Sequence, residues 1–182
     1  LKPEMFPKAL ASGADMVCIE LEDGIAPKDK KEARIKALKL FEAPQAEDGV
    51  ERILRINSIR ERFGIEDILA ILEAENPPPS LMMPKVKHPE EVVMLDQLLT
   101  ERGHETRLHV IIETNAGLEA SYEIANCCKR IEAMFFGGVD MAAELRCENN
   151  WEQLLHARSK VVHAAASAGL DVIDVPYLDL QN

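Results

Sequence analysis

The sequence has none of the cysteine patterns that mark a structural zinc site or a disulfide framework. Its four cysteines, Cys18, Cys127, Cys128 and Cys147, form no CxxC pair and stand at no zinc-finger spacing with a histidine. The five histidines form no i, i+4 pair and no motif with a nucleophile, so we assign them no role. We therefore expect buried, reduced thiols in a cytoplasmic protein.

The sequence also has no apolar run of the roughly 18 to 20 residues that a membrane span needs, and no basic-then-apolar segment at its beginning. These absences predict a soluble intracellular protein without a membrane partner. Basic residues are in the minority, 21 against 32 acidic ones, and the net charge of −11 disfavours binding to a nucleic acid backbone. With 182 residues, 47% of them hydrophobic, and no linker-like segment, residues 1–182 are expected to form a single domain.

What the sequence does contain is a βα repeat. Short apolar runs rich in β-branched residues recur along the chain and are separated by charged segments with helical periodicity. The predicted strands are Met16–Leu21, Arg52–Ile56, Leu81–Val86, Leu108–Ile112, Ala133–Phe136 and Leu170–Val175. The predicted helices are Pro3–Ser12, Pro27–Phe41, Ile65–Glu75, Pro89–Thr100, Gly117–Ala125, Ala142–Leu145 and Trp151–Ala168. The nearly continuous hydrophobicity of the strands is typical of parallel strands that are buried on both faces.

Such a repeat fits either an open doubly wound sheet or part of an eight-stranded barrel. No GxGxxG segment follows the first strand, which makes the open doubly wound sheet the less favoured alternative. Polar residues gather where the strands end, and in a barrel all these ends meet at one mouth. They are Glu22, Asp23, Arg55, Asn57, Lys85, Glu113, Asp140, Asp174 and Asp179. The pattern favours a (β/α)8 barrel.

Two carboxylates follow successive predicted strands, Glu113 in the segment IIET and Asp140 in the segment GGVD. Mg²⁺ prefers oxygen ligands and commonly takes one or two protein carboxylates. The alternative is that each carboxylate caps a helix or pairs with a nearby cation. Gly137 and Gly138 favour the metal site, because glycines let backbone N–H groups approach a bound anion.

Arg55, in the segment LRINS, lies at the end of an apolar strand and needs an anionic partner. That partner is either a substrate or a protein carboxylate such as Glu22 or Asp23. The segment ELEDGIAP crowds Glu22 and Asp23 beside Glu20, which suits acid–base work or the holding of metal-bound water, but also an ordinary helix-entry loop. Lys85 could hold an anionic substrate or neutralise nearby carboxylates.

The segments ELEDGIAP, LRINS, LMMPKV, VIIET, FFGGVD with MAAELR, and GLDVIDVPYLDL stand in an order that resembles the citrate lyase β-subunit and malyl-CoA lyase family, within the HpcH/HpaI aldolase superfamily. The resemblance runs through nearly the whole chain. It implies a (β/α)8 TIM-type barrel, usually a homotrimer, that here lacks the first strand and the C-terminal closing segment of the family.

The resemblance further implies Mg²⁺ bound by Glu113 and Asp140, with Arg55 binding the substrate and stabilising negative charge. Gly138 and Val139 would orient the substrate carboxylate through backbone N–H groups, and Asp23 and Glu22 would tune the metal waters or Arg55. The expected substrates are an acyl-CoA or acyl-carrier-protein thioester and a 2-keto acid. The expected reaction is cleavage or formation of citryl-, malyl- or citramalyl-thioesters.

Two other functions stay open from the residues. One is a CoA-independent aldolase of the same barrel class that acts on free pyruvate and an aldehyde. The other is a non-catalytic barrel that binds a carboxylate or serves as a subunit of a larger complex.

Overall fold

The computed structural model describes residues 2–42 and 48–176. Its chain divides into two compact units, the first made of Leu1–Pro84 with Leu95–Leu108 and the second of Lys85–Met94 with His109–Asn182. In both units a strand is followed by one or more helices, as the βα repeat of the sequence predicts.

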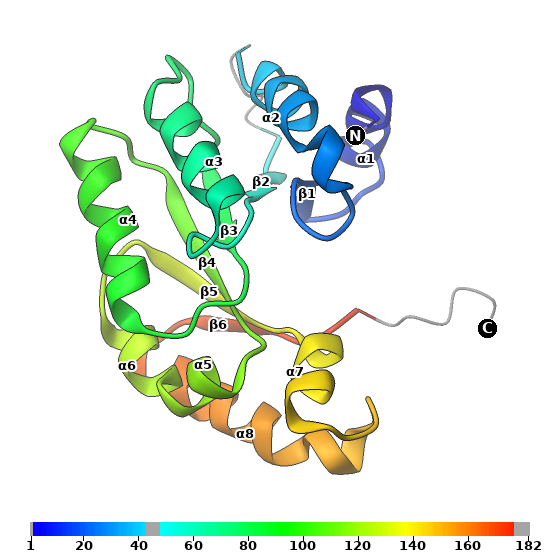
Figure 1. Ribbon diagram of the computed structural model, residues 1–182, viewed down its shortest axis with the longest axis vertical. Helices are drawn as coiled ribbons and strands as arrows, with labels where there is room; N and C mark the ends of the chain where they lie inside the picture. The colour runs from blue at the N-terminus through cyan, green and yellow to red at the C-terminus, as the bar shows by residue number, and fades with distance from the viewer. Residues whose placement is uncertain (1, 43–47, 177–182) are drawn as a thin grey trace. The chain divides into compact units, whose positions relative to one another are not determined.

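The first unit contains three neighbouring parallel strands, β1 (Met16–Glu20), β2 (Glu51–Arg55) and β3 (Ser80–Met83), seen in Figure 1. Its helices are α1 (Phe6–Leu10), α2 (Lys30–Lys39) and α3 (Arg62–Leu72), with 3-10 turns at Pro3–Met5 and Pro27–Asp29. In the register of the sheet, Glu20 pairs with Arg55. This places the end of the ELED segment beside the end of the LRINS strand.

The second unit contains β5 (Ile131–Phe136) and β6 (Asp171–Ile173), which are parallel. Its helices are α5 (Asn115–Glu119), α6 (Ser121–Asn126), α7 (Gly138–Leu145) and α8 (Trp151–Ala168). The long helix α8 packs against α6, β5 and β6 (Figure 1). Two further elements, α4 (Pro89–Glu101) and β4 (Arg107–Ile112), contain residues of both units.

The strands follow one another in the sheet in chain order, β1-β2-β3-β4-β5-β6. Strands β3 and β4 are buried almost throughout, as their continuous hydrophobicity predicts. A parallel sheet in chain order, with helices between the strands, is the arrangement of a (β/α) barrel and differs from the reordered strands of a doubly wound sheet. The predicted fold class is confirmed, while the assignment of residues 1–182 to a single domain stays a prediction.

Several predicted boundaries were wrong, each for a local reason. Strand β3 ends at Met83 and not at Val86, because Pro84 has no N–H to donate and Lys85 has a left-handed backbone with φ 53°. The predicted helix Gly117–Ala125 is two helices that meet at Ala120. Helix α7 begins at Gly138, four residues before the predicted start, so that its first turn includes Asp140.

Local contacts mark the ends of three helices. In the first turn of α4, Glu91 accepts hydrogen bonds from the N–H groups of Lys87 and His88, both at 3.2 Å. Gly169 is the left-handed C-cap of α8, and Ala11 is the C-cap of α1. No helix within 2–42 and 48–176 is both long and apolar enough to cross a membrane.

Candidate functional site

The second unit holds Glu113 directly after β4, where its side chain is buried, with 3% of the residue exposed. Its Oε1 accepts a hydrogen bond of 2.9 Å from the backbone N–H of Lys85. On the other side stands Gly137, whose N–H donates to the carbonyl of Ile112 at 3.1 Å. A Cβ at position 137 would lie 2.2 Å from Oε2 of Glu113. The carboxylate therefore occupies the space that any other residue at position 137 would fill.

Helix α7 carries the other residues that the sequence assigns to this site. Gly138 is buried at the first position of the helix, Val139 is exposed, and Asp140 lies half-buried in the first turn. Because the first N–H groups of a helix have no partner within the helix, they can bind an anion. The first turn of α7 thus carries the carboxylate of Asp140 and the N–H groups of Gly138 and Val139, directly after Gly137.

The first unit holds Arg55 at the end of β2, where its Nη2 pairs with Oε2 of Glu20 at 2.6 Å and with Oε2 of Glu22 at 3.2 Å. Burial favours the neutral form of the guanidine, but the negative charges of Glu20 and Glu22 outweigh it and raise the pKa of Arg55. The predicted ion pair between Arg55 and Glu22 is confirmed, and Glu20 is a second carboxylate partner of Arg55. Nε of Arg55 is buried without a hydrogen-bond partner in the described part of the chain. Asp23 is exposed.

A buried polar network beneath Arg55 was missed by the sequence analysis. Lys30 donates to the carbonyls of Leu21 at 3.0 Å and Glu22 at 2.8 Å, and also to Oδ1 of Asn57. Asp67 accepts from the backbone and side chain of Asn57 at 2.9 and 2.7 Å. Arg34 completes the network with a 2.6 Å pair to Asp67.

The only hint of this network in the sequence is the alternation of apolar and polar residues in α2 and α3. Lys30 and Arg34 lie one helical turn apart on α2, but charged residues at that spacing are usually solvent-exposed. The network fastens the ends of β1 and β2 to α2 and α3. It thereby restrains the backbone of the segments that contain Glu22 and Arg55.

Comparisons with known proteins show the family to which this chain belongs. The family described as HpcH/HpaI aldolase/citrate lyase matches residues 1–182. This chain belongs to that family. It is 31% identical to the L-malyl-CoA/beta-methylmalyl-CoA lyase of Cereibacter sphaeroides, with 100% of this chain and 65% of the relative covered. It is likewise 31% identical to the mitochondrial citramalyl-CoA lyase of Homo sapiens, with 92% and 54% covered.

A solved structure described as the citrate lyase beta subunit complexed with oxaloacetate and magnesium, from M. tuberculosis, superposes with a TM-score of 0.80 at 26% identity. The match covers 99% of this chain and 76% of that one. This HpcH/HpaI family chain spans less than two thirds of the length of the two curated relatives, which are named lyases.

The chemistry of Glu113 and Asp140 suits Mg²⁺, which prefers carboxylate oxygens. Glu113 is a buried carboxylate that accepts the Lys85 N–H and lies against Gly137, and Asp140 is a carboxylate in the first turn of α7. Within the described residues, no three His, Cys, Asp or Glu side chains gather as a metal site. Two carboxylates are nevertheless the usual protein contribution for Mg²⁺, with water and substrate at the other positions.

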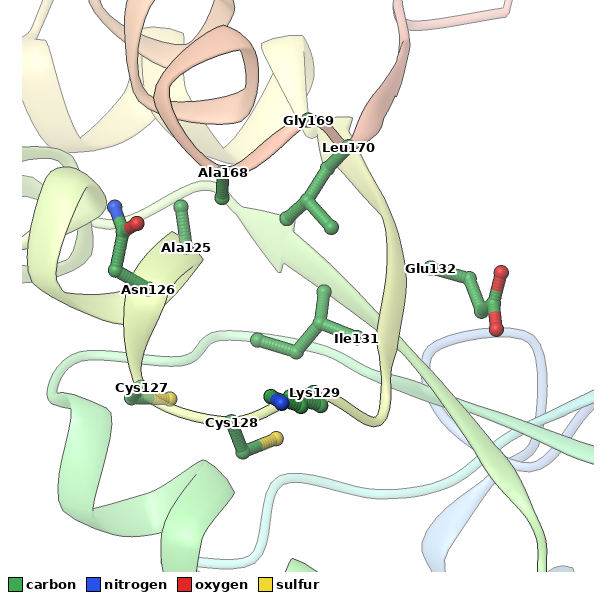
Figure 2. A pocket seen from close by; sticks show the side chains of 10 residues that line it. All are labelled: Ala125, Asn126, Cys127, Cys128, Lys129, Ile131, Glu132, Ala168, Gly169 and Leu170. Carbon is green, nitrogen blue, oxygen red and sulfur yellow. The ribbon is translucent and has the colours of Figure 1, made fainter.

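A separate cavity of about 600 Å³ lies at the amino ends of β5 and β6, near Ile131 and Leu170 (Figure 2). Glu113 and Gly137 follow the carboxyl ends of β4 and β5, so this cavity is not the site just described. Cys127 and Cys128 line it.

The prediction of four buried thiols was wrong, because Cys18 is exposed and the other three are partly exposed.

Proposed function

We propose that this chain carries the metal and substrate-carboxylate part of a Mg²⁺-dependent carbon–carbon lyase that acts on 3-hydroxyacyl thioesters. The observation that carries the proposal is the buried Glu113 carboxylate, fixed between the Lys85 N–H and Gly137, in a chain whose named relatives are thioester lyases. Glu113 and Asp140 would hold the cation. A bound Mg²⁺ supplies Lewis-acid polarisation of the keto or hydroxy acid and a template for its binding.

The other residues that the sequence assigns to the site have separate tasks in this proposal. The N–H groups of Gly138 and Val139, at the amino end of α7, orient the substrate carboxylate. Arg55 stabilises the negative charge that develops on the thioester fragment when the carbon–carbon bond breaks. Glu22 and Glu20 keep Arg55 charged and positioned. Lys85 contributes its backbone N–H to Glu113.

The substrate is proposed to be a CoA or carrier-protein thioester of malate, citramalate or citrate, cleaved into an acyl thioester and a 2-keto acid. The test is a coupled assay for keto-acid release from malyl-, citramalyl- and citryl-thioesters by the full protein, with Mg²⁺ and then with EDTA. We expect turnover of at least one thioester, abolished by EDTA. Turnover of free hydroxy keto acids alone would establish the CoA-independent aldolase in place of the lyase.

Glu113→Gln is the variant that ties activity to this site. It keeps the size of the side chain but removes the charge, so we expect turnover to fall by roughly a hundredfold or more, on the scale of losing a group that holds a catalytic metal. Glu132→Gln is the matched control, since Glu132 is an exposed carboxylate of the same unit at the amino end of β5. Full activity of the Glu113 variant would overturn the metal site.

A further inference from the structure

We infer that Lys85 and Gly137 are positioning residues for Glu113, and that Lys85 acts through its backbone conformation and not through its ammonium group. The inference rests on the proposed function, because the task of the positioned carboxylate is to hold the cation. It assigns to Lys85 a role that differs from the substrate contact expected from the sequence.

The first step concerns the backbone of Lys85. Its φ of 53° is one of only two positive values among the described non-glycine residues, and the other, at Arg146, ends a helix. A non-glycine residue in the left-handed region is uncommon and costs free energy, so it persists only where the surroundings hold it. This conformation turns the Lys85 N–H toward Glu113, with 2.9 Å between nitrogen and Oε1.

The second step concerns what holds Lys85 in that conformation. The carbonyl of the next residue, Val86, accepts a 3.1 Å hydrogen bond from the hydroxyl of Thr114. Thr114 also caps α5 by accepting from the N–H of Gly117 at 3.0 Å. A Cβ on Gly117 would lie 2.1 Å from the Val86 carbonyl oxygen. The segment that follows Glu113 is therefore fastened directly to the segment that contains Lys85.

The third step concerns Gly137, which limits the other side of the carboxylate. A Cβ there would lie 2.2 Å from Oε2, 2.5 Å from Cβ and 3.0 Å from Cδ of Glu113. Rotation of the carboxylate about the Cγ–Cδ bond would relieve only the first of these clashes, since that rotation moves neither Cβ nor the carboxylate carbon Cδ. Any side chain at position 137 must displace Glu113 as a whole. The Lys85 N–H thus holds Oε1 of Glu113. Gly137, which has no side chain, leaves the space that the rest of the Glu113 side chain occupies.

The test compares three variants of Lys85, each assayed for Mn²⁺ binding by the full protein through the EPR signal of free Mn²⁺. Glycine and asparagine tolerate the left-handed backbone, whereas valine does not. All three remove the ammonium group. We expect Lys85→Gly and Lys85→Asn to keep the dissociation constant within about twofold, and Lys85→Val to raise it roughly tenfold, the scale of losing a group that orients a metal ligand. An equal loss in all three, or no loss in any, would overturn the inference.

Gly137→Ala supplies the second arm, with folding checked by circular dichroism. We expect Mn²⁺ binding to weaken roughly tenfold or more in this variant.

A double-mutant cycle with Glu113→Gly tests the contact without any metal, because the clash disappears when the Glu113 side chain is absent. We expect most of the loss in denaturation midpoint caused by Gly137→Ala to vanish in the Glu113→Gly background, and independent effects would refute the contact. Absence of Mn²⁺ binding by the unaltered protein would overturn the proposed function, while the cycle would still decide whether Gly137 fixes Glu113.

Discussion

At the scale of single residues, Arg55 is the clearest case of one side chain with two partners. Glu20 and Glu22 hold its Nη2, and 23% of the side chain remains exposed. Two carboxylates beside one guanidinium leave a local charge of minus one. A substrate anion at Arg55 would therefore need further positive charge to balance it.

Arg55→Lys tests whether the guanidinium does more than pair with these carboxylates. Lysine keeps the charge but lacks the planar fork that contacts two acceptors at once. We expect kcat/KM to fall by roughly two orders of magnitude, the scale of losing one positioned charge-stabilising donor. The measurement is steady-state turnover of the best thioester substrate, with Mn²⁺ affinity as the control. Near-normal turnover would show that Arg55 is only a structural ion-pair partner.

At the scale of structural elements, the ends of β1 and β2 depend on a buried network that joins them to α2 and α3. Asp67, 1% exposed, receives hydrogen bonds from Asn57 and pairs with Arg34, while Lys30 binds the carbonyls that follow β1. A buried charged network is stable only while every member keeps its partners. The strand ends therefore have little freedom to move independently of the helices.

Asp67→Asn tests this dependence, because it keeps the shape of the side chain and removes its charge. The change leaves Arg34 buried beside a neutral amide, which should lower the free energy of unfolding by about 3 kcal/mol, the scale of breaking a buried ion pair. The measurement is urea denaturation followed by circular dichroism.

The control for this variant is Glu66→Gln, one position away on α3. Glu66 also pairs with Arg34, at 3.2 Å, but 30% of its side chain is exposed, so solvent screens this pair more than the buried one. We expect a much smaller change in unfolding free energy for Glu66→Gln than for Asp67→Asn. Equal effects of the two variants would contradict the assignment of the stabilisation to the buried network.

At the scale of the whole molecule, the strongest property is the net charge of −11. A polyanionic nucleic acid is repelled by such a protein, because no excess of lysine and arginine is available to replace its counterions. We expect no change in the fluorescence anisotropy of a labelled DNA duplex with up to roughly 10 μM protein at 150 mM salt, within the usual range of non-specific affinities. Saturable binding that weakens with added salt would contradict this expectation.

Much of the fold could be predicted from the sequence, because strands buried on both faces leave an unbroken hydrophobic signal. Strands β2, β4 and β5 were predicted within one or two residues at each end. The end of β3 was not, since a left-handed backbone at Lys85 has no signature in the residue type. The exposure of Cys18 was also missed. The apolar composition of β1 predicts a strand that is buried throughout, whereas its residues alternate in burial and Cys18 is on the exposed side.

Taken by itself, the sequence determined the βα order, the fold class and the set of acidic and basic residues at the strand ends. These follow from hydrophobic periodicity and from motif order, which are local properties of the chain. Only the tertiary structure decided which groups contact one another: Glu20 and Glu22 with Arg55, Asp67 with Arg34, and the Lys85 N–H with Glu113. Those contacts join residues of different strands and helices, up to 35 positions apart, and their geometry depends on how the elements pack, which no local pattern encodes.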